Sequence, residues 1–179
     1  MCIVLQTNRL ILRHLTLDDL DDLAILYADP EVRRFFPADV CDRNGTQRLL
    51  EEMIHHQEVH GFSLWATVLK ETSRLVGRCG LLCHVIDQEP FVEVAYMISP
   101  VCQNQGLATE AARGIVDCGF HQLNRSELIS LIHPGNIPSR RVAEKTGMVY
   151  QRDVEFEGII HRLYSISRNT WQLRQDTGS

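Results

Sequence analysis

The stretch that decides the fold runs from Val94 to Glu110 and reads VAYMISPVCQNQGLATE. Its first residues are rich in β-branched and aromatic side chains, which favour a strand, and this run stops at Pro100. A turn containing Gly106 follows, and the segment after it consists of good helix formers. A strand that enters a helix in this way aligns unpaired N–H groups at the positive end of the helix dipole. The stretch therefore predicts a site for an anion, of which phosphate is the typical case.

Other interpretations of this junction are possible. An ordinary strand-turn-helix connection without a ligand is one of them, and a single glycine does not exclude it. A Walker-type loop would need a Gly-Lys-Ser/Thr ending, and a dinucleotide-binding fold would need a second glycine two residues from the first. Neither pattern is present. An ordinary junction and a phosphate loop of another kind therefore remain.

Length and composition are those of an ordinary globular protein. A chain of 179 residues can bury a sizeable core, so we expect residues 1–179 to form a single domain. Hydrophobic residues make up 44% of the chain and charged residues 23%. The formal net charge of −5 argues against a nucleic-acid partner, which usually requires a basic face, and suits attraction of cationic amines.

The sequence predicts a cytoplasmic protein with reduced thiols. The first residues, MCIV, carry no basic region typical of a signal peptide, and no apolar run approaches the roughly 18 residues of a membrane span. The six cysteines are scattered and contain no C-x-x-C pattern. His55, His56 and His60 raise the question of a metal. We expect none, because no cysteine or carboxylate cluster accompanies them at ligand spacing.

Hydrophobic periodicity predicts a mixed α/β layout. A helix is expected between Thr16 and Pro30, with Thr16 as its N-cap, and a second helix after Gly45. Helices are also expected over residues 137–146 and over the segment whose apolar positions are Leu107, Ala108, Ala111, Ile115 and Phe120. Strands are expected over residues 9–13, 62–69, 75–83, 91–99, 127–133, 148–156 and 159–167. Only the tail after residue 174 looks frayed.

Two motifs give the chain a resemblance to a known family. The loop is similar to the pyrophosphate-binding loop of the GNAT N-acetyltransferases, because Gln103, Gly106 and Ala108 fill its pattern of Gln/Arg, two residues, Gly, one residue, Gly/Ala. The stretch HPGNIPSRRVAEKTGM, residues 133–148, resembles the Asn-x-x-Ser … Glu-Lys-x-Gly-Phe signature of the branch that includes the ribosomal-protein N-terminal acetyltransferases, with Met148 in place of Phe. The opening NRLILR at residues 8–13 is similar to that branch too, as is EVAY at residues 93–96.

The resemblance implies a GNAT fold, with a mixed, mostly antiparallel sheet flanked by helices, and acetyl-CoA as co-substrate without a metal. It implies that a donor near Ile98 polarises the thioester and that Asn136 hydrogen bonds the pantetheine arm; Asn136 is equally a good N-cap. The resemblance also places Ser139 beside the thioester sulfur. The loop residues that would bind the pyrophosphate are Gln103, Asn104, Gln105, Gly106, Leu107, Ala108 and Thr109.

The main candidates for catalysis are Ser139 and Glu93. Many GNAT enzymes protonate the departing thiolate with a tyrosine at the position of Ala143, so its absence favours the Ser139 hydroxyl in that role, although a serine in the first turn of a helix can equally be solvated. Glu93 is polar in an apolar strand and would either face solvent, pair with an arginine, or accept a proton from the amine. His133 is a second candidate base, although a structural role before Pro134 fits it better.

The expected reaction is direct transfer of the acetyl group to a primary amine, possibly a protein N-terminal α-amine. A small-molecule amine such as an amino acid, polyamine or antibiotic is the alternative acceptor, and a coenzyme-A-binding module without turnover is the alternative class. The three residues at 35–37, Phe-Phe-Pro, could form part of the acceptor pocket, whereas covalent catalysis by Cys102 lacks a histidine to activate it. We expect a monomer or homodimer without nucleic-acid or membrane partners.

Overall fold

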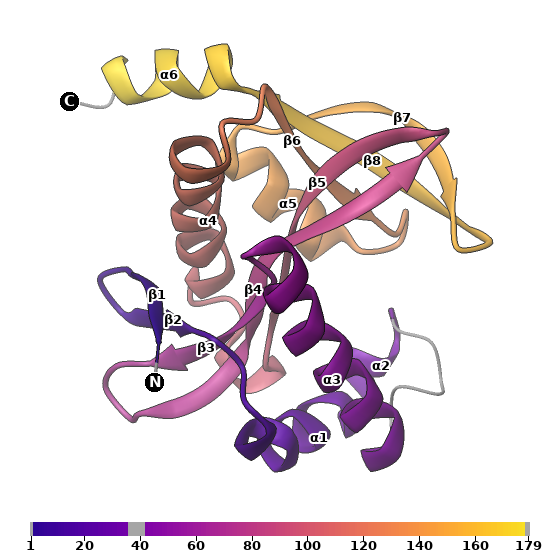
Figure 1. Ribbon diagram of the computed structural model, residues 1–179. Coiled ribbons are helices and arrows are strands. Elements are labelled where there is room, and N and C mark those ends of the chain that lie inside the picture. Colours follow the sequence, from indigo (N-terminus) through magenta and orange to yellow (C-terminus); the bar gives the residue numbers. More distant parts are fainter. Residues whose placement is uncertain (1, 36–41, 178–179) are drawn as a thin grey trace.

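One eight-stranded sheet runs through the protein (Figure 1). The structure is a computed structural model and describes residues 2–35 and 42–177. The strand order is β1-β2-β3-β4-β5-β6-β8-β7, and the neighbouring strands pair antiparallel except β5 and β6, which are parallel. The mixed, mostly antiparallel sheet predicted from the sequence is therefore confirmed. Its strands are β1 (Ile3–Gln6), β2 (Leu10–Arg13), β3 (Leu64–Leu69), β4 (Arg74–Ile86), β5 (Glu89–Ile98), β6 (Glu127–Ile132), β7 (Val149–Phe156) and β8 (Ile159–Ser167).

Helices cover both faces of this sheet, as the period-two alternation of its strands requires. Along β3, Leu64 and Ala66 pack with the helices α1 and α3, whereas Trp65 between them packs on the opposite face with α4. Each face therefore has its own hydrophobic core. The helices are α1 (Leu20–Ala28), α2 (Pro30–Arg33), α3 (Arg43–His60), α4 (Leu107–Leu123), α5 (Ile137–Thr146) and α6 (Arg168–Thr177), with short 3-10 turns η1 (Leu17–Asp19) and η3 (Pro100–Cys102).

Three elements are absent from the sequence-based prediction. The strand β1 and the one-turn helix α2 are too short to give a periodic signal. The helix α6 extends to Thr177, into the tail that we expected to fray, and Trp171 explains why this helix is ordered. The indole of Trp171 packs 5.1 Å from the ring of Phe120 and donates a 2.6 Å hydrogen bond to Asp117, both on α4. The docking of α6 depends on residues about fifty positions away, which local periodicity does not report.

The hairpin of β4 and β5 is longer than predicted. We expected strands at residues 75–83 and 91–99, but pairing continues to Ile86 opposite Glu89. Asp87 and Gln88 both have positive φ, at 51° and 67°, as a two-residue hairpin turn requires. Asp-Gln is a weaker signal for this turn than Asn-Gly or Asp-Gly, so the turn could not be predicted from the sequence. The turn at Glu157 and Gly158, with φ of 52° and 75°, lies between the strands predicted at residues 148–156 and 159–167.

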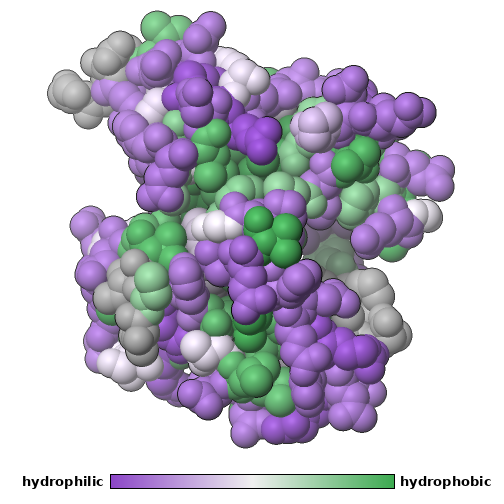
Figure 2. All heavy atoms as spheres, in the orientation of Figure 1, coloured by the Kyte–Doolittle hydropathy of each residue, from purple (hydrophilic) through white to green (hydrophobic). Residues whose placement is uncertain are grey.

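The sheet opens where its two halves meet. Between β5 and β6 the register records a single pair, Glu93 opposite Ile129. The strands β1 to β5 thus form one half, and β6 to β8 the other. Figure 2 shows the molecule waisted between an upper and a lower part, with hydrophobic residues gathered at the waist. In the described chain, no helix is long and apolar enough to cross a membrane.

Candidate functional site

The loop between β5 and α4 has the shape that the sequence predicted. After η3, Asn104 and Gly106 both adopt left-handed conformations, with φ of 60° and 79°. The side-chain amide of Gln103 donates a 3.1 Å hydrogen bond to the Ile98 carbonyl, and that of Gln105 reaches the Val101 carbonyl at 3.4 Å. These two glutamines therefore fold the loop back onto the end of β5, and what the loop presents to a ligand is mainly its backbone.

The start of α4 offers unpaired donors. Gly106 is the N-cap and supplies no side chain to cap the helix. The first intrahelical bond runs from the Glu110 N–H to the Gly106 carbonyl at 3.0 Å, so the N–H groups of Leu107, Ala108 and Thr109 precede the hydrogen-bonded part of the helix. A Cβ atom at Gly106 would meet only the Arg9 guanidinium, at 3.7 Å. Space, donors and the helix dipole therefore suit a phosphate group.

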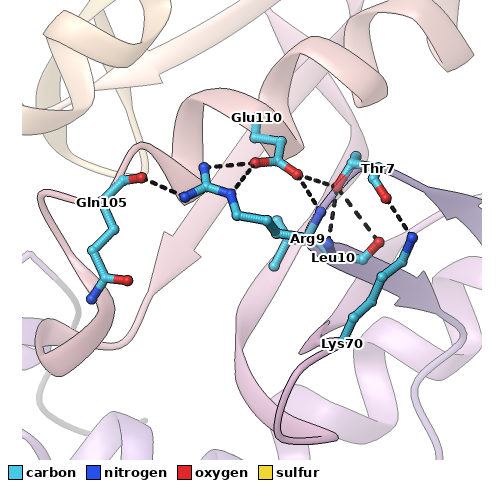
Figure 3. Close-up of polar contacts among 6 residues, drawn as sticks. All are labelled: Thr7, Arg9, Leu10, Lys70, Gln105 and Glu110. Carbon is cyan, nitrogen blue, oxygen red and sulfur yellow. Dashed lines mark hydrogen bonds and ion pairs between the residues drawn. The ribbon is translucent and has the colours of Figure 1, made fainter.

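An ion pair fixes this loop to the first strands of the sheet (Figure 3). Arg9 contacts Oε2 of Glu110 with two nitrogens, its Nε at 2.7 Å and its Nη2 at 2.6 Å. Its Nη1 donates to the Gln105 carbonyl at 2.9 Å. Thr7 completes the arrangement, because its hydroxyl donates to Glu110 at 2.6 Å. Arg9 thus holds both sides of Gly106, the turn before it and the first helical turn after it.

The Glu110 carboxylate stays charged in this arrangement. Burial opposes its charge, but hydrogen bonds from Thr7 and Arg9 outweigh that effect and lower the pKa of Glu110. The arginine side chain is 47% exposed, so the pair contributes more to geometry than to stability. Sequence analysis missed this contribution of Arg9. The strand motif NRLILR contains the residue, but its partner lies 101 positions away.

Side chains replace missing backbone hydrogen bonds where β5 and β6 diverge. The Glu93 carboxylate accepts the Leu131 N–H at 3.1 Å, and the Ser130 hydroxyl donates to the Val94 carbonyl at 2.7 Å. Beyond this point β5 bonds only to β4. Because the Ser99 N–H donates to Val76 of β4, the alternation of the strand turns the Ile98 N–H toward the open β6 side. Of the two residues at the end of this strand, Ile98 therefore has the orientation expected of a polarising donor.

Glu93 has a partner that the sequence did not predict. Its second carboxylate oxygen lies 2.7 Å from the Nε2 of His84, on the neighbouring strand β4. Both side chains are mostly buried, at 12% and 16% exposure, and the ring of Phe156 packs edge-on against His84 at 4.7 Å. The alternative positions considered for Glu93, exposed to solvent or paired with an arginine, are therefore wrong. Glu93 therefore bonds to the backbone of β6 where the two strands diverge, and the imidazole of His84 lies beside its carboxylate.

The first turn of α5 forms the other wall of the opening. Asn136 is the N-cap, as predicted, because its side-chain oxygen accepts the Ser139 N–H at 3.1 Å. The Ser139 carbonyl accepts a 2.7 Å hydrogen bond from the hydroxyl of Tyr96, which crosses from β5. Burial raises the pKa of Tyr96, and the nearby charge of Glu93 raises it further. The phenol is therefore neutral and acts as a donor that ties α5 to β5.

The remaining candidates have mainly structural contacts. The Nδ1 of His133 accepts the Gly135 N–H at 3.1 Å, and its ring lies 5.7 Å from that of Phe35, which supports the structural interpretation of this histidine. Residues 36 and 37, predicted with Phe35 to line an acceptor pocket, lie outside the described residues. The cysteines of the described chain are free, including Cys102, whereas the cysteine at position 41 is outside it.

Comparisons with known proteins point to one family. A family model described as an acetyltransferase (GNAT) domain matches residues 9–149. The protein YkkB of Bacillus subtilis is 32% identical over 153 residues, which cover 84% of this chain and 87% of YkkB. Among solved structures, a candidate ribosomal-protein-serine acetyltransferase of Vibrio cholerae is similar with a TM-score of 0.74 at 18% identity, covering 93% of this chain and 99% of that one. The aminoglycoside acetyltransferase AAC(6')-Ib, solved with coenzyme A, has a TM-score of 0.76 at 15% identity and covers 93% and 99%.

The loop before α4 can be tested with a charge placed at its glycine. We expect Gly106→Glu to abolish binding of coenzyme A, because the carboxylate repels phosphate and the side chain fills the approach to the N–H groups. Gly158→Glu is the matched control, since its φ of 75° imposes similar backbone strain and its Cβ would meet nothing within 4 Å. Calorimetric titration of coenzyme A into both variants decides the matter. Equal affinity in the two variants would contradict a phosphate loop at α4.

The contact between Tyr96 and α5 can be tested by removing one oxygen atom. Tyr96→Phe should lower the free energy of unfolding by about 0.5–1.5 kcal/mol, the usual value of one hydrogen bond. It should also lower kcat more than it raises the KM for acetyl-CoA, because Ser139 loses its fixed position while the phosphate loop is unchanged. Tyr150→Phe is the control, since that exposed hydroxyl bonds only to Asp153 in the described chain. Unchanged kcat in a destabilised Tyr96→Phe variant would leave this tyrosine a purely structural role.

Proposed function

The chain belongs to the GNAT acetyltransferase family, and from the contacts of its opened sheet we propose that it moves the acetyl group of acetyl-CoA directly to a protein N-terminal α-amine. Membership of this family makes the chain an acyltransferase. Acetyl-CoA is its proposed acetyl donor, and the similar enzyme AAC(6')-Ib, solved with coenzyme A, supports this proposal. A coenzyme-A-binding module without turnover is the less favoured alternative. We treat residues 1–179 as one domain, because a single sheet takes in strands from Ile3 to Ser167.

The residues proposed to hold acetyl-CoA lie along one path. The backbone from Gln103 to Thr109 takes the pyrophosphate at the start of α4. The pantetheine arm is proposed to lie between β5 and β6, where the Ile98 N–H faces the opening. Asn136 uses its side-chain oxygen to cap α5, so its amide nitrogen is the group proposed to bond the arm. Acetyl-CoA supplies the acetyl group as a thioester, whose carbonyl carbon is attacked by the amine. Donors fixed in advance, such as the Ile98 N–H, would stabilise the charge that develops on the carbonyl oxygen.

Two proton movements accompany the transfer. The amine has to lose a proton before it attacks, and Glu93 with its partner His84 is proposed to receive that proton, directly or through water. The thiolate that leaves gains a proton, for which the Ser139 hydroxyl is proposed as donor. The support for Glu93 is its place at the divergence of β5 and β6, with an imidazole at 2.7 Å to share the charge.

An α-amine is the acceptor that suits this base best. An α-amine has a pKa near 7.7–8.0, so roughly a tenth of it is unprotonated at neutral pH, whereas a lysine-like amine has a pKa near 10.4 and is almost wholly protonated. A carboxylate is a weak base, so it suits the acceptor that needs the least help. The two structural neighbours carry names with opposite acceptors, a ribosomal protein and aminoglycosides, at similar TM-scores. The fold therefore does not distinguish a protein N-terminus from a small amine, and the residues on the acceptor side decide between them.

The acceptor class is tested by release of coenzyme A in the presence of matched amines. The test peptide begins with a free serine or alanine and contains an internal lysine. It is compared with the same peptide acetylated at its N-terminus, in which the lysine is the remaining amine. A small diamine and an aminoglycoside complete the set. We expect turnover with the free N-terminus and little with the blocked peptide. Turnover restricted to the small amines would replace the proposed acceptor by a small molecule, and binding of coenzyme A without turnover on any amine would favour the non-catalytic alternative.

The proton acceptor is tested through the pH dependence of Glu93→Gln. The glutamine can still accept the Leu131 N–H, so the strands should keep their arrangement. We expect a loss of kcat/KM at pH 6 to 7 that shrinks toward pH 9, because more of the amine then arrives unprotonated. Glu89→Gln, an exposed carboxylate on the same strand, is the control. Superimposable profiles of Glu93→Gln and the unaltered protein would remove Glu93 from the proton path.

A further inference from the structure

The last two turns of α3 lie against an edge of the sheet that has lost its partner. The pairing of β3 with β4 ends at Leu64 opposite Gly80, although β4 continues to Ile86. The N–H groups on this free edge need other acceptors. The Leu81 N–H donates to the Ser63 carbonyl at 3.0 Å, and the Cys83 N–H donates to the Nε2 of His56 at 3.1 Å. A histidine of α3 thus takes the place of a strand carbonyl.

These hydrogen bonds settle the protonation of His56. Because its Nε2 accepts a proton donor, its Nδ1 carries the hydrogen and donates to the Phe62 carbonyl, 2.8 Å away. Burial lowers the pKa of His56, so the ring stays neutral at physiological pH. The lone pair on Nε2 therefore points toward Cys83, whose N–H it accepts in the metal-free chain. Histidines that bind metals are commonly oriented in this way, by a backbone carbonyl on the other ring nitrogen.

Two further donor atoms surround this lone pair. His60 follows His56 by one helical turn, and the two ring centroids are 4.3 Å apart. The ligand atoms of His56, His60 and Cys83 all lie within 4.8 Å of one another. The sequence offered no cysteine near these histidines, and for that reason we expected no metal. The fold supplies one from β4, 27 positions after His56.

We propose that His56, His60 and Cys83 form a site for a thiophilic divalent metal ion, with Zn²⁺ as the ion that this donor set fits best. Two imidazoles and one thiolate are ordinary zinc ligands, and a fourth position would be open to water. Ligand atoms of a tetrahedral zinc ion are about 3.5 Å apart, so the cluster has to contract by roughly 1 Å. The exposed side chain of His60 can make that adjustment. The inference is independent of the proposed acetyl transfer.

The energetics of this site are favourable in two respects and costly in two. The carbonyl end of α3 attracts a cation, and His56 is already held in the binding tautomer. Against this, metal binding replaces the hydrogen bond from the Cys83 N–H to His56. It also displaces the thiol proton of Cys83, whose pKa burial raises although the charge of Arg125 opposes that rise. The ion would tie α3 to the free edge of β4.

Cobalt and zinc titrations of the purified, chelator-treated chain test the proposal. With Co²⁺ we expect one ion per chain and an ultraviolet charge-transfer band from thiolate to metal. Cys83→Ser should remove that band, and both Cys83→Ser and His60→Ala should weaken Zn²⁺ binding at least tenfold in competition with a chromophoric chelator. His55→Ala is the matched control, because that exposed histidine lies on the same helix and contacts only Glu58 in the described residues.

Thermal melts give a second measurement that does not depend on the absorption band. Zn²⁺ should raise the Tm of the unaltered chain and of His55→Ala but not that of Cys83→Ser, since a ligand that binds only the folded state stabilises it. A Tm of metal-free Cys83→Ser close to that of the unaltered chain shows that the variant folds. The proposal is overturned if Co²⁺ gives no thiolate band, or if His55→Ala weakens Zn²⁺ binding as much as His60→Ala does.

Discussion

The divergence of β5 and β6 is the constraint on which the rest of the structure depends. Two parallel strands in one sheet would normally satisfy each other's N–H and C=O groups along their length, but here one register pair is recorded. Buried backbone groups without partners are costly, so the opening persists only because Glu93 and Ser130 provide side-chain partners for Leu131 and Val94. A chain that opens its sheet must therefore place polar side chains at the point of divergence. The carboxylate proposed as a base lies there because the fold requires an acceptor there.

The same constraint positions the phosphate loop. Because β5 has a free edge beyond Val94, its Ile98 carbonyl is available to the side chain of Gln103, which bends the loop toward the start of α4. Arg9 then fixes the two ends of the turn through Gln105 and Glu110, so the unpaired N–H groups are held before any ligand arrives. Preorganisation of this kind reduces the ordering cost of binding. The opened sheet and the rigid loop are thus two consequences of one strand that loses its partner.

Local signals carried most of the fold and part of the site. Strand periodicity, the helix over residues 137–146 and the N-cap at Asn136 depend on residues that are close in the sequence, and each was predicted. The contacts that were missed join distant residues: Arg9 with Glu110, Glu93 with His84, Tyr96 with Ser139, and Cys83 with His56. Composition and spacing alone cannot predict such pairs, because the topology decides which distant residues meet. The hairpin turn at Asp87 was missed for a different reason, because its residues are uncommon ones for that conformation.

Ala143 of α5 stands where many GNAT enzymes have a tyrosine. The position of Tyr96 explains how the site can lack that tyrosine. Ala143 is fully buried, and the Tyr96 phenol from β5 reaches the same turn of the helix from the opposite wall. The hydroxyl is not equivalent to the missing acid, however, because it already donates to the Ser139 carbonyl and its environment raises its pKa. A phenol with a raised pKa that already donates a hydrogen bond is a poor proton donor to the thiolate. It therefore positions the turn that carries Ser139, and the proposed proton donors for the leaving thiolate are the Ser139 hydroxyl and solvent. A thiol has an ordinary pKa near 8.5, so the demand on that donor is small, and the chain can accommodate alanine at position 143.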